Sequence, residues 1–99
     1  MSRTYTIDEI KTISVPVAQK FGVKKLALFG SYARREQKAN SDIDFLIEKG
    51  KVRDLFTFLG FIHALEDDLG VHVDVLTYDS LKDSLIADSI DDEVVLYEE

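Results

Sequence analysis

Helical and extended patterns of apolar residues alternate along this chain, and their order limits the fold more than any other feature. Segments 7–21 and 52–69 carry apolar residues at helical spacing, three or four positions apart. Segments 25–29, 42–48 and 71–77 are shorter and show the apolar content or the alternation that is typical of strands. Helices and strands that alternate in this way predict an α/β fold.

Local signals mark where these elements begin and end. Residues 6–9, with the sequence Thr-Ile-Asp-Glu, fit a capping box at the start of the first helix, and Gly22 supplies its stop. Pro16 lies inside this helix and should kink it or mark a break, because proline removes one backbone donor. Near the end of the chain, we expect Ser80 to cap a last helix and segment 94–97 to add an edge strand.

Length and composition exclude several classes of protein. A chain of 99 residues is expected to form a single domain over residues 1–99, and its lack of cysteine excludes disulfides and thiolate metal sites. No apolar run reaches the roughly 18 residues of a membrane span, and the N-terminus lacks the order of a signal peptide. We therefore expect a cytoplasmic protein without a membrane partner. The net charge of −7 argues against nucleic acid as the main partner, although the basic residues of segment 20–38 suit a small anionic ligand.

The stretch FGSYARREQKANSDIDFL, residues 29–46, joins two of the expected strands and holds the most informative motif. Gly30 and Ser31 follow the first of these strands directly. Glycine lets a phosphate approach the backbone closely, and a short helix over residues 31–36 would present unpaired N–H groups to that phosphate. Because Ser31 adds a hydroxyl donor, the sequence predicts a phosphate site at this corner.

Three carboxylates are expected on one face of the sheet. Side chains two positions apart in a strand point the same way, so Asp42 and Asp44 share one face of their strand. In the third strand, His72 and Asp74 share a face in the same manner. If these two strands are neighbours, the three carboxylates converge, and they repel one another unless a cation neutralises them.

A divalent cation fits such a group of acids. All-oxygen ligands suit Mg²⁺ or Mn²⁺, which share their coordination with substrate phosphates. Two ions of this kind can stabilise both the attacking and the leaving oxygen of an in-line phosphoryl displacement. The sequence has no P-loop, no dinucleotide-binding glycine motif and no EF-hand, so these other phosphate and metal sites are excluded.

Taken alone, each of these features has a simpler interpretation. An isolated Asp-x-Asp pair is more often a solvated turn or a helix cap than a metal site, and a strand histidine such as His72 is more often a packing or rim residue. The combination of Gly30 and Ser31 with the acids Asp42, Asp44 and Asp74 is what favours a nucleoside triphosphate site.

These residues resemble the minimal nucleotidyltransferases of the DNA polymerase beta superfamily. The motif of that family is Gly-Ser, ten residues, and then Asp-x-Asp, and this chain matches it with Gly30 and Ser31 followed by Asp42 and Asp44. Asp74 stands where the family has its third carboxylate. The resemblance implies a palm-like fold, with helices packed on a small mixed sheet of three to four strands, and it covers nearly the whole chain.

The resemblance also implies the roles of the site residues. Asp42, Asp44 and Asp74 would be the catalytic acids and would bind two Mg²⁺ ions, with Mn²⁺ as an alternative, and Asp74 would also help to activate the acceptor hydroxyl. Gly30 and Ser31 would hold the triphosphate of ATP.

Two arginines follow the Gly-Ser pair. Arg34 is expected to contact the nucleotide. Arg35 occupies the position where the family commonly has a second glycine, and a residue with a side chain tolerates a positive φ poorly. The family pattern therefore does not predict the turn after the short helix, and we expect the site to tolerate Arg35.

Short members of this family resemble the antitoxin half of two-gene systems whose partner is an all-helical HEPN ribonuclease toxin. The resemblance implies that the chain transfers AMP from ATP to a tyrosine of the toxin and thereby neutralises it. Two alternatives are a non-catalytic antitoxin that inhibits the toxin by complex formation, and a transferase for a small hydroxylated acceptor such as an aminoglycoside.

The apolar sector of the long helix over 52–69 is wider than contact with one sheet requires. Phe56 and Phe61 flank its stripe of leucines and isoleucine on a helical wheel. The extra width indicates either a partner surface or a surface that the chain termini cover.

Overall fold

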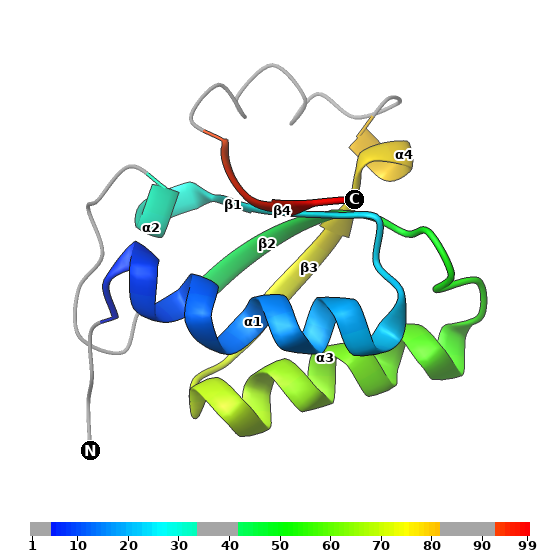
Figure 1. Ribbon diagram of the computed structural model, residues 1–99, viewed down its shortest axis with the longest axis horizontal. Helices are drawn as coiled ribbons and strands as arrows, with labels where there is room; N and C mark the ends of the chain where they lie inside the picture. Colours follow the sequence, from blue (N-terminus) through cyan, green and yellow to red (C-terminus); the bar gives the residue numbers. More distant parts are fainter. Residues whose placement is uncertain (1–4, 34–41, 82–92) are drawn as a thin grey trace.

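The computed structural model describes residues 5–33, 42–81 and 93–99. Its elements are α1 (Ile7–Phe21), β1 (Lys25–Phe29), α2 (Gly30–Ala33), β2 (Ile43–Glu48), α3 (Leu55–Leu69), β3 (Val73–Thr77), α4 (Tyr78–Leu81) and β4 (Val94–Glu98). The strands form one sheet, and the two long helices α1 and α3 lie beside each other against one face of it (Figure 1). This arrangement confirms the predicted α/β fold.

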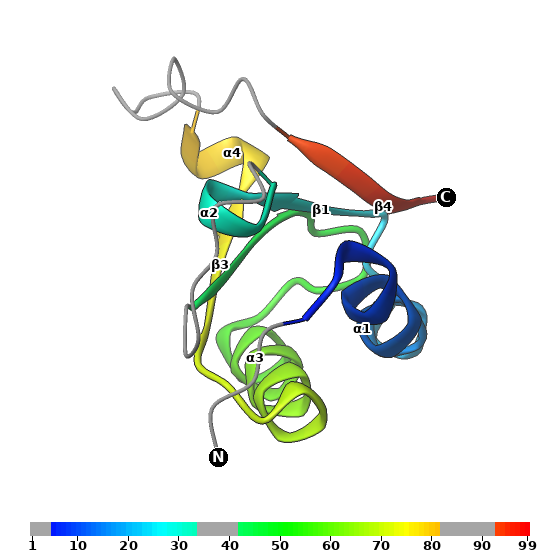
Figure 2. The same ribbon diagram turned by 90° about the vertical axis from the view of Figure 1, so that its left-hand side faces the viewer.

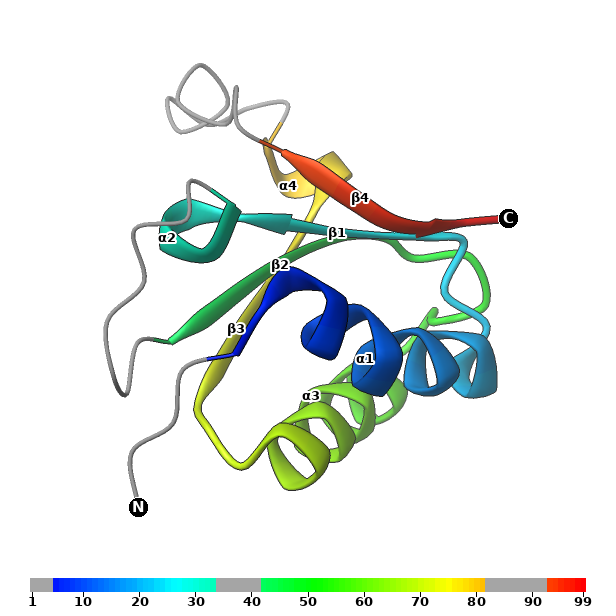
Figure 3. The ribbon, with the colours of Figure 1, turned by 60° about the vertical axis from the view of Figure 1, so that its left-hand side comes forward.

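The sheet is mixed, as predicted, and has the strand order β3-β2-β1-β4. β1 pairs antiparallel with β2 and with β4, whereas β2 and β3 are parallel. A parallel pair needs a crossover connection, and α3 supplies it on the same side of the sheet as α1, while α4 lies on the other side (Figure 2). α2 follows β1 at the end of the sheet where β2 and β3 begin, and α4 follows β3 at the opposite end (Figure 3).

The main core lies between the sheet and the two long helices. From β2 it takes Ile43, Phe45 and Ile47, all of which are fully buried. The opposite face of β2 contributes only Leu46 to a smaller cluster with Ala27 of β1. One face of β2 therefore packs in the main core, and the other face carries polar side chains near the start of the strand.

The ends of α1 agree with the prediction. Thr6 and Glu9 form both bonds of a capping box, with the Thr6 N–H donating to Glu9 Oε1 at 3.0 Å and the Glu9 N–H donating to Thr6 Oγ1 at 3.1 Å. Gly22 ends the helix with a φ of 78°. Of the two outcomes predicted at Pro16, a break is wrong, because α1 continues through this residue as one helix, and a kink stays a prediction. Pro16 has no backbone N–H, so the helix lacks one hydrogen bond there. The residues that follow it, such as Val17, are buried and hold the helix against the core.

The second long helix begins later than predicted. The apolar pattern placed its start near Val52, whereas α3 begins at Leu55 after the cap Asp54. The Asp54 carboxylate accepts the backbone N–H of Thr57 at 3.2 Å. Val52 is buried in the segment before the helix. The polar cap, and not the first apolar residue, fixes where this helix starts.

The C-terminal part of the chain agrees with the prediction in one element and differs in another. β4 confirms the expected edge strand. The prediction that Ser80 caps the last helix is wrong, since Ser80 lies inside α4, which begins directly after β3. The remainder of that predicted helix falls in residues 82–92, outside the described part of the chain. Within the described ranges, none of the helices has the length and apolar character needed to cross a membrane.

Candidate functional site

β2 and β3 place the predicted acids on the open face of the sheet. Asp44 and Asp74 are direct partners in the parallel ladder between these strands. Ile43 and Val73, the preceding residues of the two strands, are buried on the other face, in the main core. Asp42 lies immediately before β2, at the same end of the sheet. The alternation of each strand thus separates the acids from the apolar residues of the main core.

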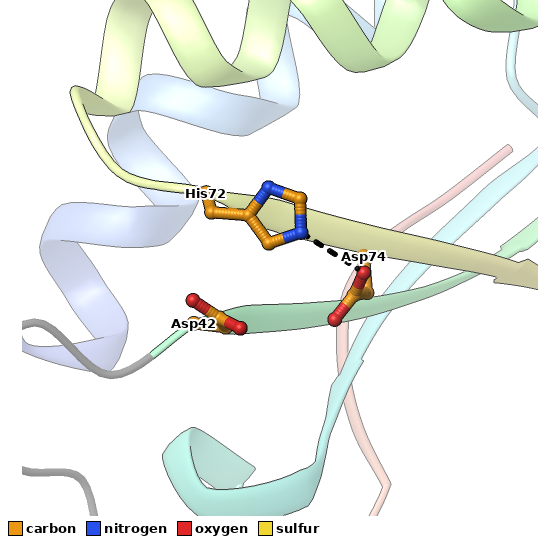
Figure 4. Close-up of side chains that lie close together, drawn as sticks. All are labelled: Asp42, His72 and Asp74. Carbon is orange, nitrogen blue, oxygen red and sulfur yellow. Dashed lines mark ion pairs between the residues drawn. The ribbon is translucent and has the colours of Figure 1, made fainter.

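Asp42, His72 and Asp74 form a tight cluster at this end of the sheet (Figure 4). Each of the three offers one ligand atom, and these atoms all lie within 4.8 Å of one another. All three side chains are exposed. Two carboxylate oxygens and one imidazole nitrogen at this separation can coordinate a single divalent cation. Two of the three predicted ligands, Asp42 and Asp74, belong to this cluster, whereas Asp44 does not.

His72 is held on both of its ring nitrogens. Its Nε2 lies 3.3 Å from Oδ1 of Asp74, as the dashed line in Figure 4 shows. Its Nδ1 lies 2.9 Å from Oε2 of Glu66, and the same Glu66 oxygen accepts the backbone N–H of Val73 at 3.1 Å. The last turns of α3 therefore fix the orientation of a side chain at the start of β3.

The ionisation of His72 reflects these neighbours. Partial desolvation of the ring lowers its pKa, but the negative charges of Asp74, Asp42 and Glu66 raise it by more. The net result is a pKa above the ordinary value of 6.5. The negative electrostatic potential of the carboxylates favours a positive charge in the cluster, either a proton on the His72 ring or a metal ion beside it.

Gly30 lies against the acid Asp44. Its φ of 74° is in the left-handed region that favours glycine. A Cβ built on Gly30 would overlap with Oδ2 of Asp44 and lie 3.2 Å from its Cγ. The corner after β1 therefore requires glycine both for its backbone conformation and for the space that the carboxylate takes up.

The remaining predicted residues are placed only in part. The backbone of Ser31 belongs to α2, but its side chain is outside the described atoms, and Arg34 and Arg35 fall in residues 34–41, which are not described. Tyr32 is fully buried and anchors α2 in the core. The roles assigned to Ser31 and Arg34 stay predictions.

The structure adds two residues that sequence reasoning did not include in the site. The sequence favours a packing or rim role for His72 and indicates no role for Glu66. The signal for His72 is in the sequence, since it shares a strand face with Asp74 two positions away. The sequence holds no such signal for Glu66, because its contact with His72 depends on how the end of α3 packs against the start of β3.

Comparison with known proteins identifies a family. The family model for the nucleotidyltransferase domain matches residues 10–97. A protein of Methanocaldococcus jannaschii that is provisionally named a protein adenylyltransferase is 46% identical over 89 residues, which cover 86% of this chain and 96% of that protein. The protein adenylyltransferase MntA of Thermococcus cleftensis is 37% identical over 94 residues, which cover 91% of this chain and 94% of that protein.

A solved structure shares the fold. It is described as a tri-AMPylated HEPN toxin of Shewanella oneidensis in complex with an MNT antitoxin, and the matching chain superposes with a TM-score of 0.68. The match covers 93% of this chain and 72% of that one, at 17% identity. At this level of identity the likeness concerns the fold.

Proposed function

Because the chain belongs to the nucleotidyltransferase domain family, we propose that it transfers AMP from ATP to a tyrosine of a partner protein. The observation that carries this proposal is the placement of Asp42, Asp44 and Asp74 on one open face, beside a corner that requires Gly30. Relatives named protein adenylyltransferases support AMP as the group transferred and protein as the acceptor.

The proposed reaction is an in-line displacement at the α-phosphorus of ATP. The tyrosine oxygen forms a bond to this phosphorus, the bond to the bridging oxygen breaks, and pyrophosphate leaves. The carboxylate of Asp74 takes the proton of the tyrosine hydroxyl, directly or through water. Bound divalent ions, which we propose to be Mg²⁺, would neutralise the charge that develops on the attacking and leaving oxygens.

Each acid has its part in holding the reactants. Asp42, Asp44 and Asp74 would hold the ions, since their oxygens are the ligands that Mg²⁺ prefers. Gly30 and Ser31 would hold the triphosphate at the corner after β1, and Arg34 would contact it. The tight fit between Gly30 and Asp44 would keep the phosphate corner and the metal ligands at a fixed distance.

We propose that the partner is a HEPN-type ribonuclease toxin and that the transfer neutralises it. A structural relative with the same fold is described as a complex of an AMPylated HEPN toxin with an MNT antitoxin, which supports this partner. The chain would then be a cytoplasmic antitoxin.

Two labelled forms of ATP test the transfer. The chain is incubated with Mg²⁺, the protein encoded by the neighbouring gene, and ATP that is labelled either at the α-phosphate or at the γ-phosphate. Transfer of AMP puts the α-label on the partner and leaves the γ-label in pyrophosphate. Labelling of the partner from the γ-phosphate, or from neither position, would contradict the proposal.

A second candidate function is inhibition of the partner by complex formation alone. One observation favours it: α3 exposes large apolar side chains near its start, with Leu55 at 67%, Phe56 at 86% and Leu59 at 43% exposed. An apolar surface of this kind suits a protein partner. The double variant Asp42→Ala with Asp44→Ala separates the two functions, because a binding antitoxin keeps its protective effect in cells at equal abundance, whereas an enzyme loses it.

A further inference from the structure

We propose that His72 is a direct metal ligand through Nε2, oriented by Glu66, and that the site for this reason binds Mn²⁺ more tightly than Mg²⁺. The inference rests on the function proposed above, because it takes the cluster to be the metal site of the transferase. It assigns a ligand beyond the three carboxylates that the sequence motif predicts.

The contacts of the ring fix which nitrogen is available. Nδ1 faces the carboxylate of Glu66 at 2.9 Å, so this nitrogen donates its hydrogen to Glu66. In a neutral imidazole the other nitrogen then carries a lone pair. Nε2 lies 3.3 Å from Oδ1 of Asp74, and one ring nitrogen of His72 lies within 4.8 Å of a carboxylate oxygen of both Asp42 and Asp74 (Figure 4). The lone pair is therefore placed where a shared cation would bind.

Glu66 has the position of a residue that orients a metal-binding histidine. Such histidines usually donate their second ring N–H to a carboxylate or a carbonyl, which fixes the tautomer and the ring plane. Glu66 is itself fixed, because its Oε2 also accepts the N–H of Val73 at 3.1 Å. Its side chain is 29% exposed, compared with 60% for His72, so the orienting group is the more buried of the two.

The donor set decides which ion is preferred. Mg²⁺ selects oxygen ligands in near-ideal octahedral geometry, whereas imidazole suits transition-metal ions. Mn²⁺ accepts the carboxylates of Asp42 and Asp74 as readily as Mg²⁺ does and also gains from the nitrogen of His72. Replacement of this nitrogen should weaken the binding of Mn²⁺ more than that of Mg²⁺.

Pulsed electron paramagnetic resonance of Mn²⁺ bound to the full, untagged chain tests the ligand directly, because a coordinated imidazole nitrogen modulates the spin echo of the ion. The chain has two histidines and no cysteine, so His63 is the matched control. It is exposed on α3 and lies outside the cluster. We expect the nitrogen modulation in the wild type and in His63→Gln, and its loss in His72→Gln. Exposure of the His72 side chain makes this variant compatible with folding, and a thermal melt verifies it.

Binding constants give the second readout. We expect His72→Gln to weaken the binding of Mn²⁺ about tenfold or more and that of Mg²⁺ less, and Glu66→Gln to weaken Mn²⁺ binding by a smaller factor. The proposal would be overturned if the wild type bound no Mn²⁺ or showed no nitrogen modulation. Persistence of the modulation in His72→Gln would also overturn it, as would equal weakening of Mn²⁺ and Mg²⁺ binding in that variant. Neither readout depends on AMP transfer. A chain with a nitrogen-ligated ion and no transferase activity would contradict the proposed function alone, and an active chain without the nitrogen signal would contradict this inference alone.

Discussion

Gly30 and Asp44 are packed so closely that the glycine leaves no room for a side chain beside the carboxylate. This contact follows from the antiparallel pairing of β1 and β2, in which Phe29 is the partner of Asp44. The chain leaves β1 at Gly30 and must return in that register. The spacing between the Gly-Ser pair and the Asp-x-Asp pair is therefore the number of residues over which the chain returns from Gly30 to Asp44.

Gly30→Ala should damage both stability and the site. A Cβ at this position adds backbone strain at φ 74° and displaces the Asp44 carboxylate, so we expect a loss of about 2 to 4 kcal/mol of unfolding free energy and loss of AMP transfer. Denaturant unfolding and a transfer assay measure the two effects.

Gly70→Ala is the matched control for this variant. Gly70 has a similar φ of 70°, but a Cβ built there meets no atom within 4 Å. We expect this variant to lose about 1 kcal/mol from strain and to keep its transfer activity. Equal effects of the two substitutions would show that strain alone, and not the contact with Asp44, makes Gly30 necessary.

Asp74→Asn should separate binding from chemistry. An amide cannot take the proton of the acceptor hydroxyl, so we expect the transfer rate to fall at least about a hundredfold while affinity for a non-hydrolysable ATP analogue changes little. Calorimetry and turnover measure these quantities, and Asp67→Asn, at an exposed position on α3, controls for the change in charge. Parallel losses of affinity and rate would contradict the role of Asp74 as the base.

Tyr5→Phe should lower stability without affecting the site. The buried Tyr5 hydroxyl donates to the backbone carbonyl of Leu69, and this bond ties the segment before α1 to the end of α3. Removing the hydroxyl should cost about 1 kcal/mol of unfolding free energy, because the Leu69 carbonyl loses this partner in a buried place. Denaturant unfolding measures the loss. Unchanged stability, or a loss of transfer activity in a fully folded variant, would contradict this assignment.

Asp54 should give the stability of the protein a defined pH dependence. Hydrogen bonds from the side chain and then the backbone of Thr57 hold the pKa of Asp54 below its ordinary value of 3.8. The stabilisation is therefore present above the unfolded pKa and is lost as pH falls through the lower folded pKa. Asp54→Asn retains a capping oxygen that does not titrate. We expect the difference in unfolding free energy between this variant and the wild type to be constant near neutral pH and to change below about pH 4. A difference independent of pH down to complete protonation would contradict the lowered pKa.

Local chemistry explains which elements of the fold could be predicted. The capping box at Thr6 and the stop at Gly22 act within a few residues of α1, so both ends of this helix followed from sequence alone. The start of α3 could not be predicted from sequence alone. Val52 fits the helical period, but it lies before the cap Asp54 and is buried by tertiary packing. The continuity of α1 through Pro16 likewise depends on packing that a local rule does not contain.

The candidate site divides in the same way. The faces of Asp42, Asp44 and Asp74 follow from strand alternation and from the pairing of β2 with β3. The contact between Glu66 and His72 joins the end of α3 to the start of β3 and has no signature in residue spacing. The face that His72 shares with Asp74 follows from strand alternation, whereas the contact of its Nδ1 with Glu66 does not.

The most direct test of this account is the mass of the partner protein after co-expression with the chain. Transfer of AMP to a tyrosine predicts a partner that carries the mass of at least one AMP group on a tyrosine-containing peptide. The same peptide should be unmodified after co-expression with the Asp42→Ala, Asp44→Ala double variant. A partner that is neutralised by the wild-type chain but carries no AMP would contradict the account.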